Sequence, residues 1–135
     1  MRYMMLIYSK ETPDGPSAED VEQLRAGHRK AMQEASRKGV LRGAEPLAPT
    51  TTATTVRVQD GKILVTDGPF AETKEQLAGY YILECENLDE AIDWAAKIPT
   101  TCKGDAGCIE IRPMPGLPAQ FESEAAADHA SGLNG

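Results

Sequence analysis

A hydrophobic run ends abruptly at Asp67-Gly68-Pro69-Phe70, in the stretch ILVTDGPFAETKE of residues 63–75. Glycine reaches backbone angles that are closed to other residues, and proline fixes its own φ and lacks an amide donor. A strand that meets Gly-Pro must therefore leave its sheet through a rigid turn. Asp67 is the last side chain of that strand. Its carboxylate either bonds the amides of its own turn or forms part of a site.

A second turn signal lies just before this strand. Asp60-Gly61 separates two runs in which apolar and polar residues alternate, residues 56–59 and 62–65. Asp-Gly is a preferred two-residue turn between antiparallel strands. In the register that it sets, Val58 opposes Ile63, so one face of the predicted hairpin is apolar.

The charge balance narrows the range of partners. The chain has 135 residues, enough for one domain with its own core, and carries 14 basic against 21 acidic residues, a net charge of −7. Binding to nucleic acid needs clustered Lys and Arg, and anionic membranes attract the same residues. No apolar run approaches the ~20 residues of a membrane span, and the apolar start is too short for a signal peptide. We therefore expect a cytoplasmic protein that binds neither nucleic acid nor membrane.

The cysteines favour a reducing compartment. Three are present, Cys85, Cys102 and Cys108, an odd number without the paired short spacings of structural zinc sites. Cys102 and Cys108 flank a loop and could bridge on oxidation or help to hold a metal, but two ordinary thiols are the simpler interpretation. No phosphate-binding loop, dinucleotide fingerprint or nucleophile elbow occurs. We expect neither a metal nor a cofactor.

Strands and helices follow one another in a simple order. Apolar patterns predict strands at residues 2–8, 40–47, 78–84 and 108–112. A helix opens at the capping pair Ser17 and Asp20 and ends at Gly39. A second helix opens at the capping pair Asn87 and Glu90 and runs through Ile98, before Pro99. Between the second and third strands, we expect residues 50–55 to be extended and residues 71–76 to form one helical turn.

Without the insertion of residues 49–77, the order is β-α-β-β-α-β. This order is the ferredoxin-like split βαβ, an α+β fold in which two helices cover one face of an antiparallel sheet. The strands at 2–8 and 78–84 are its central neighbours. The other sheet face is also apolar and needs a cover. A two-fold homodimer that packs sheet on sheet is the simplest one.

The residues resemble one family. The resemblance is carried by these motifs: Met4-Met5-Leu6-Ile7-Tyr8, Gly39-Val40-Leu41, Glu45-Pro46-Leu47, Thr54-Thr55-Val56-Arg57, Val65 through Glu75, Gly79-Tyr80-Tyr81-Ile82, Ala91-Ile92-Asp93-Trp94-Ala95 and Ile109-Glu110-Ile111-Arg112-Pro113. The chain is similar to the YCII-related family, DGPF-domain subgroup. The resemblance covers a domain of residues 1–114 and leaves residues 115–135 as an acidic C-terminal tail rich in Pro, Gly and Ala.

The resemblance implies a ferredoxin-like fold and a dimeric α+β barrel. Most such proteins have no assigned activity, and many resemble products encoded beside extracytoplasmic-function sigma factors. The wider superfamily has a His–Asp pair in a cleft. Its His lies eleven residues before the glycine that ends the first helix, the position of His28 here, while its Asp precedes the proline that ends the second helix, where this chain has Ile98. Asp67 is our candidate substitute for that aspartate.

Each candidate site residue has two interpretations. His28 falls on the inward stripe of the first helix, as a core histidine or as a site residue that faces a cleft. Tyr80 and Tyr81 point to opposite sheet faces, so that one lies in the core or dimer interface and the other in the cleft. Tyr8 and Phe70 complete the candidate ligand-binding set, together with Asp67.

Two main functional hypotheses and a third follow. The first is a small homodimer that binds an organic ligand in a cleft near the DGPF turn, in a regulatory setting linked to sigma factors. The second is a cofactor-independent lyase or isomerase with His28 as general acid/base and Asp67 as its partner. The third is a purely structural dimerisation module.

Overall fold

The computed structural model describes residues 1–100 and 107–117. The strands are β1 (Arg2–Ser9), β2 (Leu41–Pro46), β3 (Thr54–Gln59), β4 (Lys62–Asp67), β5 (Gln76–Glu84) and β6 (Gly107–Met114), and the helices are α1 (Ala18–Arg37), the 3-10 turn η1 (Thr50–Thr52) and α2 (Leu88–Ala95). Strands β2, β5, β1 and β6 form one antiparallel sheet in that order, and β3 and β4 form a separate hairpin.

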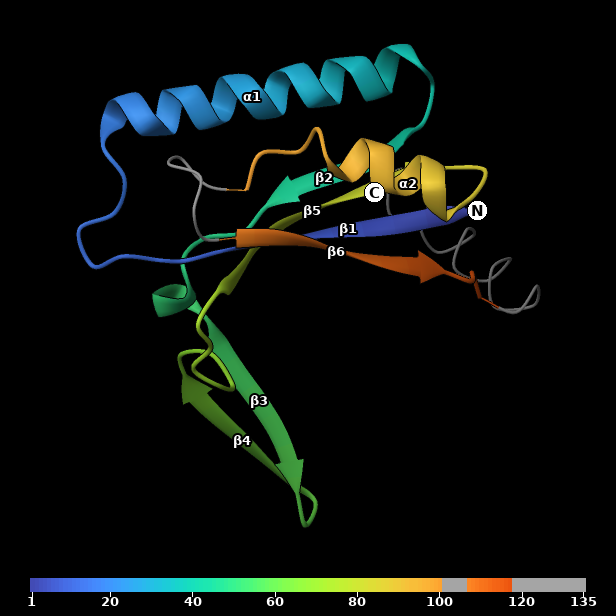
Figure 1. Ribbon diagram of the computed structural model, residues 1–135. Coiled ribbons are helices and arrows are strands. Elements are labelled where there is room, and N and C mark those ends of the chain that lie inside the picture. Colours follow the sequence, from blue (N-terminus) through green and yellow to red (C-terminus); the bar gives the residue numbers. More distant parts are fainter. Residues whose placement is uncertain (101–106, 118–135) are drawn as a thin grey trace, which may run out of the picture.

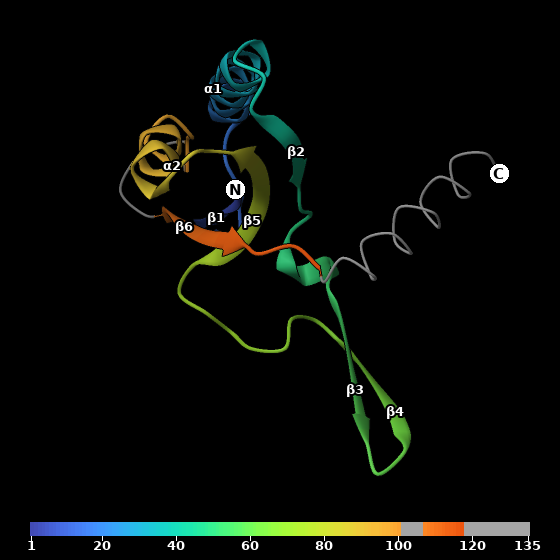
Figure 2. The ribbon, with the colours of Figure 1, turned by 90° about the vertical axis from the view of Figure 1, so that its right-hand side faces the viewer.

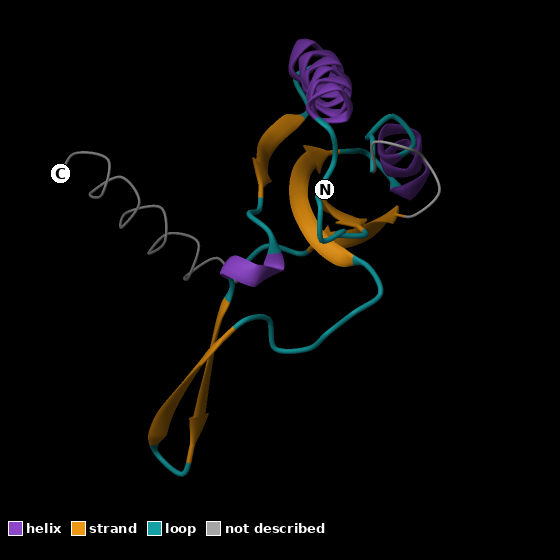
Figure 3. Cartoon of the chain, turned by 90° about the vertical axis from the view of Figure 1, so that its left-hand side faces the viewer, coloured by secondary structure: helices purple, strands orange, loops and turns teal. Residues whose placement is uncertain are grey.

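This topology confirms the predicted ferredoxin-like fold. The central strands β1 and β5 pair in antiparallel register, Met5 opposite Tyr81 and Leu6 opposite Tyr80. Both helices lie on one side of the sheet, and the β3–β4 hairpin projects from the other side (Figure 1). The same two sides appear when the molecule is turned (Figures 2 and 3).

The core lies between the helices and the sheet. Met5 and Leu83 are the largest fully buried side chains, and both come from the central strands. Helix α1 presents the small residues Ala31 and Ala35 there, whereas α2 presents Ala91 and the large ring of Trp94. The large side chains of the strands and Trp94 fill the space between helices and sheet.

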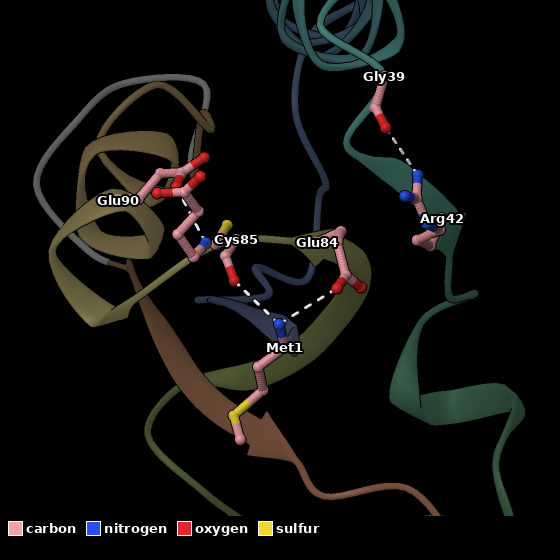
Figure 4. Close-up of polar contacts among 7 residues, drawn as sticks. Met1, Gly39, Arg42, Glu84, Cys85 and Glu90 are labelled. Carbon is pink, nitrogen blue, oxygen red and sulfur yellow. Dashed lines mark hydrogen bonds and ion pairs between the residues drawn. The ribbon is translucent and has the colours of Figure 1, made fainter.

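Both helices begin where the capping pairs predict. The Ser17 Oγ accepts the Asp20 amide at 3.1 Å, and the Asn87 Oδ1 accepts the Glu90 amide at 2.9 Å. The Glu90 carboxylate in turn accepts the amide of Glu86, the residue before the N-cap, at 2.9 Å, which further fixes the start of α2. The polar contacts around this end of the sheet are drawn in Figure 4.

The N-terminus is held at the same end. The Met1 ammonium donates to the Glu84 carboxylate and to the Cys85 carbonyl, both at 3.1 Å (Figure 4). The Arg42 guanidinium donates to the Gly39 carbonyl at 2.8 Å, beside the end of α1. These bonds tie the chain end and the α1–β2 connection to the sheet, although the ion pair is exposed and adds little stability.

Four details differ from the sequence prediction. Helix α2 ends at Ala95 and not at Ile98, because the Lys97 and Ile98 amides bond the third residue back in a tightened last turn. Residues 50–52 form η1 and are not extended. Residues 71–75 form no helical turn. Strand β6 continues through Pro113, which an edge strand tolerates because its outer side needs no donor.

Candidate functional site

His28 and Tyr81 form the central polar contact between α1 and the sheet. The His28 Nδ1 lies 2.7 Å from the Tyr81 hydroxyl, and that hydroxyl lies 3.4 Å from the His28 carbonyl. Their rings are tilted at 52° with centroids 5.8 Å apart. The helix places His28 one turn before Ala31, on its inward stripe, and β5 places Tyr81 on the sheet face that α1 covers.

Burial favours the neutral forms of both Tyr81 and His28. Tyr81 is only 4% exposed, and burial raises its pKa to about 12. His28 is half-buried, and burial lowers its pKa below the ordinary value of 6.5. Desolvation disfavours the charged form of each group. The pair is therefore a neutral imidazole bonded to a neutral phenol at pH 7.

The hydrogen-bonding capacity of the imidazole is only half used. Within residues 1–100 and 107–117, the only hydrogen-bond partner of the imidazole is Tyr81, which bonds its Nδ1, and no carboxylate takes part. The Nε2 has no hydrogen-bond partner among these residues. It donates if the Tyr81 hydroxyl donates to Nδ1, and it accepts if Nδ1–H donates to the hydroxyl.

Asp67 lies elsewhere. It is exposed at the end of β4, opposite Thr54, in the hairpin that projects from the side of the sheet without helices (Figure 1). Helix α1, which carries His28, lies on the other side. Within one chain the structure thus brings His28 to Tyr81 and does not bring it to Asp67.

The turn after Asp67 closes the root of the hairpin. Gly68 has a φ of 100°, a backbone conformation that favours glycine. Its amide donates to the Ala53 carbonyl at 2.7 Å, and its carbonyl accepts the Thr55 hydroxyl at 2.8 Å. Gly68 therefore has a structural part in holding the two strands together at their base.

The remaining candidate residues are dispersed. Tyr80 opposes Leu6 on the open face of the sheet, and Tyr8 lies half-buried beyond an irregularity in the β1–β5 register. Phe70 is 76% exposed after the turn. The prediction that Tyr80 and Tyr81 face opposite sides agrees with this arrangement, and Tyr81 is the one beside His28.

A groove of about 290 Å³ lies between α1 and the chain that follows α2, and it involves none of the predicted residues. It is lined by Gly27, Lys30, Ala31, Glu34 and Lys97. The Lys97 ammonium lies 3.6 Å from the Glu34 carboxylate and 4.6 Å from the centre of the Trp94 ring. Its charge is therefore already engaged by neighbours on the two helical segments.

The described residues contain no cluster of three or more His, Cys, Asp or Glu side chains that could hold a metal ion. Cys85 and Cys108 are free thiols there, while Cys102 lies outside the described residues. None of the helices in the described part is long and apolar enough to cross a membrane.

Sequence reasoning found both members of the polar pair but not their pairing. His28 was singled out by its helical stripe and Tyr81 by its central strand. The predicted fold could have indicated that His28 and Tyr81 lie close together, because the first helix of a split βαβ packs across the central strands.

Comparison with known proteins gives the family. Residues 1–115 match the model of the YCII-related domain. An uncharacterised protein of Rhizobium meliloti (strain 1021) is 37% identical over 115 residues, which are 84% of this chain and 92% of that protein. The chain belongs to the YCII-related family.

A solved structure has a similar chain course at low identity. It is a 5-chloro-2-hydroxyhydroquinone dehydrochlorinase of Burkholderia phenoliruptrix in complex with 2,5-dihydroxybenzoquinone. The two chains are 18% identical, with a TM-score of 0.47, over 87% of this chain and 96% of the other.

Proposed function

We propose that this protein is a cytoplasmic homodimer that binds a small organic molecule at His28, where α1 faces β5. The observation that carries the proposal is the half-buried imidazole whose Nδ1 is engaged by Tyr81, while its Nε2 has no hydrogen-bond partner within the described residues. A hydrogen-bonded ring held in one orientation is a better binding group than a mobile one, because less side-chain entropy is lost on binding. The open sheet face supplies the dimer interface.

The chemistry of the pair defines the class of ligand. Both groups are neutral at pH 7, so they offer no charge to a strongly ionic ligand. In the tautomer with Nε2–H, this nitrogen donates to a carbonyl or a hydroxyl group, and in the other tautomer it accepts from a hydroxyl group. We therefore expect a neutral carbonyl or hydroxyl compound.

A catalytic function is the second candidate, and the lowered pKa of His28 favours it. An imidazole that stays neutral at pH 7 can accept a proton from a substrate, and an isomerase or lyase without a cofactor needs such a base. In this version Tyr81 orients the ring through Nδ1. The part of Asp67 as partner of His28 stays a prediction, which a substitution can test.

Two further hypotheses complete the proposal. A regulatory setting beside sigma factors, which the family resemblance implies, suits a module that binds a ligand without converting it. A purely structural dimer would bind no small molecule at all.

Thermal-shift measurements with a panel of small neutral ketones, aldehydes and alcohols test the binding proposal. A compound at 100 times its Kd stabilises the folded protein by about 2.7 kcal/mol. We expect this stabilisation to be lost in His28→Gln and kept in His129→Gln, which changes the other histidine of the chain. An Asp67→Asn protein tests whether the turn carboxylate belongs to the site.

The outcomes separate the hypotheses. A stabilising compound that acts equally on wild type and His28→Gln would remove His28 from the site. For each ketone or aldehyde that binds, proton NMR in deuterated water then distinguishes the two functions. Exchange of its α-protons that depends on His28 indicates the enzyme, and binding without exchange or turnover indicates the ligand-binding module.

A further inference from the structure

The β3–β4 hairpin carries an uncovered apolar surface. Val56 and Val58 of β3 oppose Val65 and Ile63 of β4, so these four side chains share one face, which we call the aliphatic patch. They are 60%, 72%, 64% and 72% exposed, respectively. A hairpin of two strands is marginal in water unless it packs on something. We therefore expect another surface to pack on the aliphatic patch.

The described part of the chain does not cover the patch. Strands β3 and β4 make their main packing contacts with each other, among the elements within residues 1–100 and 107–117. The hairpin projects away from the sheet and both helices in every view (Figures 1, 2 and 3). The cover must come from outside the described part of the chain.

The root of the hairpin is nevertheless fixed to the domain. Glu11, in the loop after β1, accepts the Thr50 amide at 2.9 Å and the Thr50 hydroxyl at 2.6 Å. Its own amide donates to the Gln76 side chain at 2.8 Å. The Gly68 turn closes the two strands just beyond this anchor. A projecting arm with a fixed root is preorganised for a partner, which lowers the entropic cost of association.

We propose that the hairpin is an arm that packs its aliphatic patch on a second copy of this chain. The proposal rests on the homodimer proposed above and adds a second contact to it. The arm projects from the same side as the open sheet face, where Leu6 and Tyr80 lie. A two-fold axis that joins two open faces brings each arm alongside the other protomer, and it uses both apolar surfaces in one closed assembly.

The area agrees with a second copy. Four aliphatic side chains exposed to this extent offer on the order of 250 Å² of apolar surface per arm. Two arms and the surfaces that they cover then bury about 1,000 Å², the lower bound for a specific interface, before the sheet faces are added. Residues 54–67 carry two basic and two acidic side chains on a chain of net charge −7, which disfavours an anionic membrane as the cover.

Sedimentation equilibrium tests the arm with two neighbouring substitutions. Val58→Asp places a charge in the patch, while Gln59→Asp places the same charge one residue on, on the opposite face of β3. Because a two-fold dimer carries each substitution twice, a tenfold loss per copy weakens dimerisation by about 100-fold. We expect that loss for Val58→Asp and for Ile63→Asp, and no change for Gln59→Asp. Fluorescence of Trp94, which is buried on the helix side, confirms that each variant folds.

The results distinguish the arm from the dimer. A monomeric wild type overturns both the homodimer and the arm. A dimeric wild type whose Kd is unchanged by Val58→Asp and Ile63→Asp overturns the arm alone, as does an equal loss in Gln59→Asp. Hydrogen exchange gives a second test without any substitution. Amides of residues 54–67 should exchange more slowly in the dimer than in dilute monomer, and equal rates overturn the arm.

Discussion

Replacing Tyr81 by phenylalanine isolates the hydroxyl that engages His28. The hydroxyl lies 2.7 Å from the His28 Nδ1, and the Tyr81 ring is 4% exposed. Phenylalanine keeps the ring and removes only the oxygen, so the core loses almost no volume. The change therefore tests the hydrogen bond and not the packing.

The expected loss of stability follows from that geometry. A hydrogen bond of this kind contributes about 0.5–1.5 kcal/mol net. The His28 imidazole is half-buried, so water can reach part of the ring and reduce the cost of the lost partner. We therefore expect Tyr81→Phe to lower the free energy of unfolding by about 1 kcal/mol. With a urea m-value of about 2 kcal/mol/M, the midpoint moves down by about 0.5 M.

Tyr3→Phe is the matched control for this measurement. Tyr3 is 6% exposed on the same sheet face, and its hydroxyl makes no hydrogen bond within the described residues. Both variants are unfolded in urea at one protein concentration, because the stability of a dimer depends on concentration. The ¹⁵N shifts of the His28 ring, which report its tautomer, should change in Tyr81→Phe and stay unchanged in Tyr3→Phe. Equal midpoints for the two variants, with unchanged ring shifts in both, would refute the proposed role of the Tyr81 hydroxyl.

Two further predictions concern pH and the sheet. Because burial lowers the pKa of His28, the unfolded chain binds a proton at this residue more readily than the folded chain does. The contribution of His28 to the free energy of unfolding is therefore complete above its ordinary pKa of 6.5, and it is lost as pH falls through the lowered pKa of the folded state. Urea midpoints from pH 8 to 5 should show this loss in wild type, and an equally steep loss in His28→Gln would contradict it. A Cβ at Gly79 would lie 2.8 Å from the Glu45 carbonyl oxygen, so Gly79→Ala should cost about 1–3 kcal/mol. At Gly43 the nearest atom is 3.7 Å away, an ordinary contact, and Gly43→Ala should cost clearly less in the same urea experiment.

Local signals in the sequence predicted most of the fold. The capping pairs fixed the starts of both helices, and Asp60-Gly61 fixed the register of the hairpin. These signals depend on only three or four neighbouring residues, so they can be recognised without knowing how the rest of the chain folds. The end of α2 was predicted too late because Pro99 limits a helix without specifying how its last turn relaxes.

The candidate site was harder to predict because it depends on contacts between distant segments. His28 and Tyr81 are 53 residues apart, and their contact depends on how α1 is placed across β5. The superfamily pattern suggested a carboxylate, and Asp67 was the carboxylate that the sequence made conspicuous. We chose Asp67 because it precedes the rigid Gly68-Pro69 turn. Such a turn predicts where a strand ends, but it does not predict which residue the Asp67 side chain contacts.

The turn at Gly68 and the His28–Tyr81 pair therefore have different roles in the structure. Gly68 and the Glu11 anchor hold the root of a hairpin whose aliphatic patch is left uncovered by residues 1–100 and 107–117. His28, on helix α1, and its partner Tyr81 lie on the other side of the sheet from that hairpin, and the Nε2 of His28 has no hydrogen-bond partner among the described residues. A substitution in the patch should change the assembly before it changes ligand binding, and a substitution of His28 should do the reverse. If the two effects cannot be separated, the ligand site spans the dimer, and the arm contributes to it from the second copy.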